Sequence, residues 1–175
     1  RLTEITIPNS VTKIYYLAFF SCDSLTKIVI PDSVTWMGEG VFSGCSALTD
    51  VTLSENLTYL NTMCFKDCSS LESITLPSKV TSLEERCFSG CRKLNTIIVE
   101  AFRSPPVIKA NSFMNVSSSY SKNIYVQDSI LESYKTAENW SSLFASVYKL
   151  KAMSTLPETL RSVVSQSTKD LYGWT

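Results

Sequence analysis

The feature that most constrains this chain is an internal repeat of 23 residues. Leucine recurs at this spacing, and the apolar residues that follow each leucine fall into register with one another. The recurring leucines are Leu2, Leu25, Leu48, Leu71 and Leu94. A repeat of this size is one supersecondary unit that cannot bury its apolar face alone, so neighbouring units must stack. The sequence therefore predicts a solenoid in which each repeat forms one coil.

Each coil begins with the pattern L-x-x-I-x-I or a close variant of it. The apolar positions of this pattern are Leu2/Ile5/Ile7, Leu25/Ile28/Ile30, Leu48/Val51/Leu53, Leu71/Ile74/Leu76 and Leu94/Ile97/Val99. Its alternating end, rich in β-branched residues, predicts a short strand with one buried face. In three repeats Pro8, Pro31 or Pro77 follows at once, and proline lacks the N–H that would extend the ladder. Each coil is therefore predicted to start with a strand and then turn.

Further columns of the repeat keep their chemistry from coil to coil. They comprise Val11, Val34, Leu57 and Val80; Ile14, Met37, Leu60 and Leu83; Ala18, Val41, Cys64 and Cys87; Phe19, Phe42, Phe65 and Phe88; and Cys22, Cys45, Cys68 and Cys91. Such repetition indicates that each side chain stacks on its own copy in the next coil. We therefore predict that these columns form the internal core.

The period changes after Cys91. The coil that begins at Leu94 has two extra residues and contains Pro105-Pro106, a rigid pair that suits a lengthened loop. Its later positions place Ile108, Phe113 and Val116 in the columns of Leu83, Phe88 and Cys91. A polar stretch then leads to Ile124-Tyr125-Val126, which predicts one more strand.

A cap is expected where the array ends, because the last coil would otherwise expose its core. Asp128 is placed to cap a helix at its N-terminus. The residues expected to cover the open end are Ile130, Leu131, Tyr134, Ala137, Trp140, Leu143, Phe144 and Val147 to Leu150.

We divide the chain into a solenoid over residues 1–150 and a C-terminal extension over residues 151–175. The solenoid comprises full repeats over 1–93, a lengthened repeat over 94–119 and a capping coil and helix over 120–150. The extension is expected to be helical, beginning near Pro157 and either docked on the cap or leading to another domain. Its candidate apolar face contains Leu156, Leu160, Val163, Val164 and Leu171. Since Arg1 enters a repeat directly, we expect a fragment or a processed form.

The consensus L-T-x-I-x-I-P-x-S-V-T-x-I-x-x-x-A-F-x-x-C, visible in LTKIVIPDSVTWMGEGVFSGCSA, resembles the BspA-like class of leucine-rich repeats. The resemblance covers roughly residues 1–150. It implies an α/β solenoid, a right-handed superhelix with a parallel β-sheet on one face and short helices or turns on the other. The position of the asparagine ladder in commoner leucine-rich repeats is occupied here by Ser10, Ser33, Asn56 and Lys79, a departure typical of this class.

The same resemblance implies a cell-surface or secreted protein. It also implies adhesion to a host extracellular matrix protein, a bacterial surface protein or a glycan. The resemblance brings no catalytic motif, so the sequence predicts a binding module and not an enzyme. The alternative is a structural spacer or surface-layer element without a specific ligand.

Composition and charge argue against several other functions. Lys and Arg number 16, as do Asp and Glu, so no net field draws the chain to nucleic acid. No apolar run is long enough for a membrane-spanning helix. The absence of histidine removes the commonest acid/base and metal ligand, and Glu84-Glu85 is typical of a solvated face. We therefore expect no catalytic residues, no metal and no cofactor.

Six cysteines leave three interpretations open. An even count in an exported protein suggests disulfides, and the pairs Cys64/Cys68 and Cys87/Cys91 could also be read as a four-thiolate zinc site. The 23-residue period instead explains them as a reduced ladder of small apolar side chains, and Val116 in the same column favours this reading. A disulfide between stacked coils would have to accept the geometry of the ladder.

Two surfaces are candidates for binding. The first is the outward side of the strand face, which is rich in threonine and includes Thr6, Lys27, Thr52 and Thr75. Its other outward positions are Thr3, Glu4, Thr26, Val29, Thr49, Asp50, Glu72, Ser73, Asn95, Thr96 and Ile98. The second is an aromatic edge formed by Trp36 and Tyr59, which share a repeat column, with Tyr15 and Tyr16 beside them.

Overall fold

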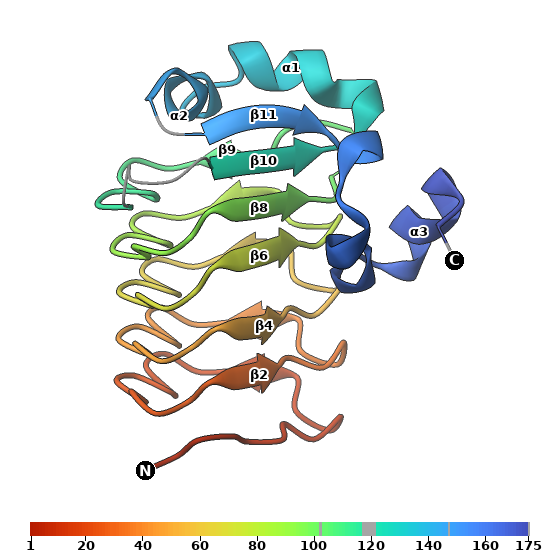
Figure 1. Ribbon diagram of the computed structural model, residues 1–175. Helices are drawn as coiled ribbons and strands as arrows, with labels where there is room; N and C mark the ends of the chain where they lie inside the picture. The colour runs from red at the N-terminus through yellow and green to blue at the C-terminus, as the bar shows by residue number, and fades with distance from the viewer. Residues whose placement is uncertain (102, 117–121, 147, 175) are drawn as a thin grey trace.

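The chain forms a solenoid of parallel strands, seen in a computed structural model that describes residues 1–101, 103–116, 122–146 and 148–174. Coils stack one above another from the N-terminal to the C-terminal end, with the strands along one face (Figure 1). Turns lie along another side of the coils, at the left in Figure 1, and the helices lie after the array. The predicted fold class is therefore confirmed.

Six strands of the described residues lie on the strand face. They are β2 (Lys27–Val29), β4 (Asp50–Thr52), β6 (Ser73–Leu76), β8 (Thr96–Val99), β10 (Lys122–Val126) and β11 (Tyr148–Ala152). Pairing is parallel in the orders β2-β4 and β6-β8-β10-β11. Equivalent repeat positions face one another, as Ile28 faces Val51 and Ile74 faces Ile97. The strand expected over residues 2–7 is not formed as a regular strand, although Thr26 N–H donates to the carbonyl of Thr3.

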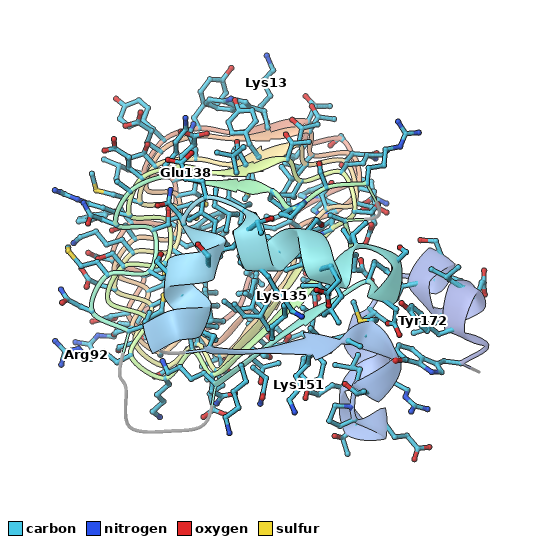
Figure 2. The ribbon with its side chains drawn as sticks, turned by 90° about the horizontal axis from the view of Figure 1, so that it is seen from above. Lys13, Arg92, Lys135, Glu138, Lys151 and Tyr172 are labelled. Atoms are coloured by element: carbon cyan, nitrogen blue, oxygen red, sulfur yellow. The ribbon has the colours of Figure 1, made fainter. Side chains whose placement is uncertain are left out.

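A second parallel ladder, which the sequence did not predict, runs along another side of the coils. It consists of the two-residue strands β1 (Lys13–Ile14), β3 (Trp36–Met37), β5 (Tyr59–Leu60), β7 (Ser82–Leu83) and β9 (Val107–Ile108). The pairs are β1-β3 and β5-β7-β9. Each strand buries the second of its two residues, so this ladder supplies the core column that begins at Ile14. Figure 2 shows Lys13 of this ladder and Lys151 of β11 on opposite sides of the molecule.

The predicted phenylalanine column is confirmed as a continuous stack. Ring centroids are 5.2 Å apart between Phe19 and Phe42, 5.4 Å between Phe42 and Phe65, and 5.5 Å between Phe65 and Phe88. Phe113 of the lengthened coil continues the stack 5.4 Å from Phe88. The two extra residues are therefore accommodated outside this column, before β9.

The turn side requires two left-handed backbone positions in each coil. The first of these contains Leu17, Gly40, Met63 and Arg86, and the second contains Ser21, Gly44, Asp67 and Gly90. The left-handed conformation costs an L-residue roughly 1–2 kcal/mol, whereas glycine adopts it freely. The N–H groups at most of these positions donate to the next coil, as Met63 N–H does to the carbonyl of Glu85 at 3.0 Å. The turns therefore form a third inter-coil ladder, maintained at some backbone strain.

Replacing Arg86 with glycine is expected to stabilise the chain. Arg86 has a φ of 55° and an exposed side chain, so the substitution relieves strain and removes little packing. The larger entropy of glycine in the unfolded chain offsets part of this gain, which leaves about 0.5–1 kcal/mol. Urea unfolding of Arg86→Gly measures the effect, and Arg92→Gly is a matched exposed control outside the left-handed positions. A lower midpoint for Arg86→Gly than for wild type would contradict the strain argument.

The predicted cap covers the C-terminal end of the array. It comprises the 3-10 helix η1 (Asp128–Ile130), α1 (Leu131–Thr136) and α2 (Trp140–Ser146), which lie over β11 and the last coil (Figure 1). Trp140 is fully buried, and its indole N–H donates to the carbonyl of Pro106 at 2.6 Å. Nδ2 of Asn139 donates to the carbonyl of Ile108, also at 2.6 Å. Side chains of the cap thus bind backbone groups at the end of the second ladder.

Two expectations about the cap need qualification. Asp128 does not cap a helix, because its Oδ1 accepts the N–H of Ser154, at 2.9 Å, from the extension. Val147 lies outside the described residues, as do residues 117–121 of the polar stretch, and the side chain of Phe144 is likewise not described.

The C-terminal extension is helical but does not form the single amphipathic helix that was expected. It contains the 3-10 helices η2 (Met153–Thr155) and η3 (Glu158–Val163) and the helix α3 (Gln166–Tyr172), while β11 crosses the expected boundary at residue 150. Val163 and Leu171, placed on the apolar face by the sequence, are exposed. The segment lies beside the carboxyl ends of β6, β8 and β10 (Figure 1). Among the described residues, no helix is long and apolar enough to cross a membrane.

Candidate functional site

The cysteine column not only packs in the core, as the repeat pattern predicted, but also forms hydrogen bonds between coils. The thiols of Cys45, Cys68 and Cys91 each lie 3.0–3.1 Å from the carbonyl of a phenylalanine 26 residues earlier. Burial raises the pKa of Cys45 to about 12 and that of Cys68 well above its ordinary value, so both remain thiols and can donate. All six cysteines are free, and the described part of the chain contains no group of three or more potential metal ligands. These thiols therefore link successive coils by hydrogen bonds.

Three of the four residues of the predicted aromatic edge lie together in the structure. The rings of Tyr15 and Trp36 meet edge to face with centroids 5.7 Å apart, and Tyr16 is 70% exposed beside them. Trp36 and Tyr16 both line a pocket of about 530 Å³. Tyr59 occupies the equivalent of Trp36 in the next coil, but it does not line this pocket. Trp36, Tyr15 and Tyr16 thus form one surface, and Tyr59 lies outside the pocket.

We call this pocket the turn-side notch. Its lining residues are Tyr16, Leu17, Phe20, Trp36, Glu39, Gly40, Ser43, Asn61, Met63 and Lys66. In two repeat columns of the lining, a small residue of the second coil stands between large residues of the first and third coils. These columns are Leu17/Gly40/Met63 and Phe20/Ser43/Lys66. The notch therefore exists because the second coil has no large side chain at either position.

Gly40 is favoured in the notch, but not required, since Leu17, Met63 and Arg86 hold the same left-handed position in other coils. The φ of Gly40 is 60°, and a Cβ at this position would lie 2.8 Å from Cδ2 of Leu17. The side chains of Leu17 and Phe20 are 46% and 54% exposed, so the rim of the notch is apolar and open. Sequence reasoning missed both residues, although the large-small-large order of the two columns was a usable signal.

The predicted residues of the strand face divide between two grooves. Thr6 and Lys27 line a groove of about 630 Å³ across the first two coils. Lys27, Thr52 and Thr75 line a second groove of about 320 Å³, which residues 162–165 of the extension close on one side. Lys27 forms an exposed ion pair with Asp50 at 2.7 Å, and hydrogen bonding to Asp50 raises the Lys27 pKa. Its charge is therefore balanced within the surface.

The sequence suggested that the strand face is exposed along its whole length, but part of it is covered. Ile98, predicted as an exposed position, is fully buried, and Thr96 is only 8% exposed. Ile98 and its neighbour Tyr125 pack with Met153, Leu156 and Val164 of the extension in a second core cluster. The extension thus covers the outward face of the last coils and leaves the threonine-rich coils accessible.

Glu55 places a carboxyl with a raised pKa in the second groove. Burial is the main cause, the nearby carboxylates of Glu100 and Asp32 add to it and Lys79 opposes it, and together they place the pKa of Glu55 at about 7. Both grooves and the notch are open concavities of the surface.

Comparisons with known proteins agree with this architecture. A sequence profile of the BspA type leucine rich repeat region matches residues 1–121 in six copies. A comparison with curated proteins finds no significant match. Among solved structures, a leucine rich cell surface protein from Faecalibacterium prausnitzii is 34% identical, with a TM-score of 0.53 over 66% of this chain and 31% of that chain.

Two more distant structures share the fold. A leucine rich repeat protein of T. pallidum is 24% identical, with a TM-score of 0.57 over 66% of this chain and 52% of that chain. The pneumococcal vaccine antigen PcpA is 16% identical, with a TM-score of 0.56 over 82% of this chain and 38% of that chain. The chain spans less than two thirds of each of these proteins. Because the profile matches more than half of the sequence, the chain belongs to the BspA-type leucine-rich repeat family.

Proposed function

We propose that this chain is a non-catalytic module of a cell-surface or secreted protein and that it binds a partner protein through the turn-side notch. The observation that carries the proposal is the exposure of large apolar side chains around one pocket. Soluble proteins seldom leave such side chains clustered at the surface unless they contact a partner. Membership of a family with a solved cell-surface relative supports the location. A host matrix protein or a bacterial surface protein is the class of partner that the sequence resemblance implies.

The lining of the notch favours a protein over a glycan. Leu17 and Met63 offer aliphatic walls, and the aromatic ring of Phe20 has no polar group with which to bind a hydroxyl. Trp36 and Tyr16 add rigid aromatic surface, which is enriched at the centres of protein interfaces. An apolar side chain of a partner entering the notch would displace water from these walls, which is the main source of affinity expected here.

Binding to a panel of immobilised, purified extracellular matrix proteins and a glycan array tests the proposal. The variants are Trp36→Ala and Phe20→Ala, and the matched control is Tyr59→Ala, an aromatic in the same repeat column as Trp36 but outside the notch. For a matrix protein that binds, we expect each notch variant to lose about tenfold or more in affinity, as a hot spot does. Tyr59→Ala is expected to remain close to wild type.

Other outcomes separate the alternatives. Binding that both notch variants leave unchanged would contradict the notch as the site. Glycan binding without protein binding would indicate that the partner is a glycan and not a protein. A chain that retains neither would support the alternative of a structural spacer or surface-layer element.

A further inference from the structure

A buried glutamate holds the C-terminal extension on the strand face. Glu100 occupies the column that contains Pro8, Pro31, Ser54 and Pro77 in the other coils, directly after β8. Its side chain is fully buried, and its Oε1 accepts the backbone N–H of Ser165 at 2.6 Å. Ser165 is also the N-cap of α3, where its hydroxyl accepts the N–H of Thr168. One carboxyl therefore anchors the start of α3 to the array.

The other oxygen of this carboxyl is not satisfied. Oε2 of Glu100 is buried and has no hydrogen-bond partner. Burial raises the pKa of Glu100, and this effect outweighs the opposing hydrogen bonds from Ser165 and Thr168 and the charge of Lys169 on α3. A buried ionised carboxylate with one free oxygen is costly, whereas the protonated form avoids most of that cost.

A second carboxyl lies close enough to add to the cost of ionisation. Glu55 lines the groove that residues 162–165 close, and the charge of Glu100 raises its pKa. Asp32 and Lys79 face Glu55 with opposite charges. Docking of the extension removes water from this region, so the repulsion between ionised Glu55 and Glu100 is stronger when the extension is docked.

We propose that residues 153–174 form a pH-dependent clasp, which docks on the strand face most tightly when Glu100 is protonated and is released as this carboxyl ionises. A group whose pKa is raised by docking favours docking fully below its ordinary pKa of about 4.3, and the contribution is lost as the pH rises through the raised value. Release exposes the apolar side chains of Ile98 and Tyr125, which now lie beneath the clasp. The surface offered to a partner therefore enlarges towards neutral and alkaline pH.

A third carboxyl at the clasp, that of Asp128, favours docking in its ionised form. Its titration falls below the pH range in which Glu100 changes docking. Burial raises the pKa of Asp128, yet hydrogen bonds from Ser154 and Tyr172 outweigh it and leave the pKa below its ordinary value. Its contribution is present above the ordinary pKa of about 3.9 and is lost only in stronger acid. Figure 2 shows Tyr172 where the extension meets the array. Between pH 5 and 8 this contact stays constant, so the change in docking follows Glu100 and Glu55.

Hydrogen–deuterium exchange of the full chain at pH 5, 6, 7 and 8 tests the clasp, with rates expressed as protection factors relative to an unstructured chain at each pH. In wild type, we expect protection of residues 153–174 to fall severalfold from pH 5 to pH 8, while protection of β6 and β8 changes little. Each unit of difference between the docked and undocked pKa changes the docking equilibrium by about tenfold. Constant protection of the extension would overturn the proposal.

Variants identify the titrating group. Glu100→Gln retains an oxygen to accept the Ser165 N–H but cannot ionise, so its extension should keep the same protection at pH 5 and pH 8. Glu158→Gln removes an exposed charge from the extension itself and should behave as wild type. Glu55→Gln removes the repulsion and should be better protected than wild type at pH 8, which gives a second reading if Glu100→Gln fails to dock. A wild-type pH dependence in Glu100→Gln would contradict the assignment to Glu100, and wild-type protection of Glu55→Gln at pH 8 would contradict the repulsion.

Discussion

Replacing Phe65 with alanine is expected to destabilise the chain by about 3–5 kcal/mol, the usual cost of a large cavity in a core. Phe65 is fully buried at the centre of the phenylalanine stack, 5.4 Å from Phe42 and 5.5 Å from Phe88. In a solenoid each coil contacts only its neighbours, so loss of this ring weakens two of the interfaces that join the coils. Urea unfolding followed by far-UV circular dichroism measures the effect.

The matched control is Phe20→Ala, which removes the same side chain one residue after the equivalent position in the first coil. Phe20 is 54% exposed on the rim of the notch, so its loss should change stability by less than about 0.5–1 kcal/mol. The two variants together separate packing from binding, because Phe20→Ala should weaken partner binding and Phe65→Ala should mainly weaken the fold. Similar unfolding midpoints for the two variants would show that the stack is not the main inter-coil contact.

A broader transition in Phe65→Ala would carry additional information. Repeat arrays unfold cooperatively only while the interfaces between repeats are strong relative to the coils themselves. If the weakened interfaces uncouple the coils, the apparent m-value falls because less surface is exposed in each step. An unchanged m-value with a lower midpoint would indicate that the array still unfolds as one unit.

The core could be predicted from sequence because every coil repeats the same apolar residues at the same positions. Phe19, Phe42 and Phe65 recur at 23 residues, and only stacked coils place such side chains in contact. The strand face followed from the alternation of apolar and polar residues for the same reason. The second ladder could not be predicted in this way, because two-residue strands such as Trp36–Met37 are too short to show an alternation of apolar and polar residues.

The covered part of the strand face could have been recognised from one column. Val29, Thr52, Thr75, Ile98 and Tyr125 occupy equivalent outward positions, and the last two are apolar where the extension docks. An apolar pair in a column that is otherwise largely threonine indicates that something covers it. What covers it could not be predicted, since the extension lies outside the repeat.

The turn-side notch was not predicted for a different reason. Its walls come from three coils, and each coil contributes residues that look unremarkable alone. Taken alone, Gly40 is interpreted as a turn glycine and Met63 as a core side chain. Their place in the lining of the notch becomes evident only when both are aligned with Leu17 and Arg86, which occupy the same repeat position. Exposure at such positions depends on neighbours above and below, which the period specifies only once the coils are stacked.

Replacing Trp140 with alanine is expected to open the C-terminal end of the array. Trp140 is fully buried, its ring contacts Tyr134 edge to face with centroids 5.1 Å apart, and its indole N–H binds the Pro106 carbonyl. Loss of the side chain leaves a cavity under α1 and α2 and an unpaired carbonyl beside β9, at a cost of about 3–5 kcal/mol. Trp140→Phe keeps an aromatic ring but loses the hydrogen bond, so it should fall between wild type and alanine.

The cap should loosen before the coils beneath it, because each coil depends only on its neighbours. In Trp140→Ala, hydrogen exchange should accelerate first in α1, α2 and β11 and last in β4 and β6. Exposed strand edges pair with other chains, so this variant should also associate with itself as its concentration rises, which light scattering coupled to size-exclusion chromatography detects. Trp36→Ala, a tryptophan of the notch, should leave both readouts unchanged. If Trp140→Ala instead remained monomeric with wild-type exchange in α1 and α2, the cap would owe its stability to the strand pairing of β10 with β11 and not to this buried indole.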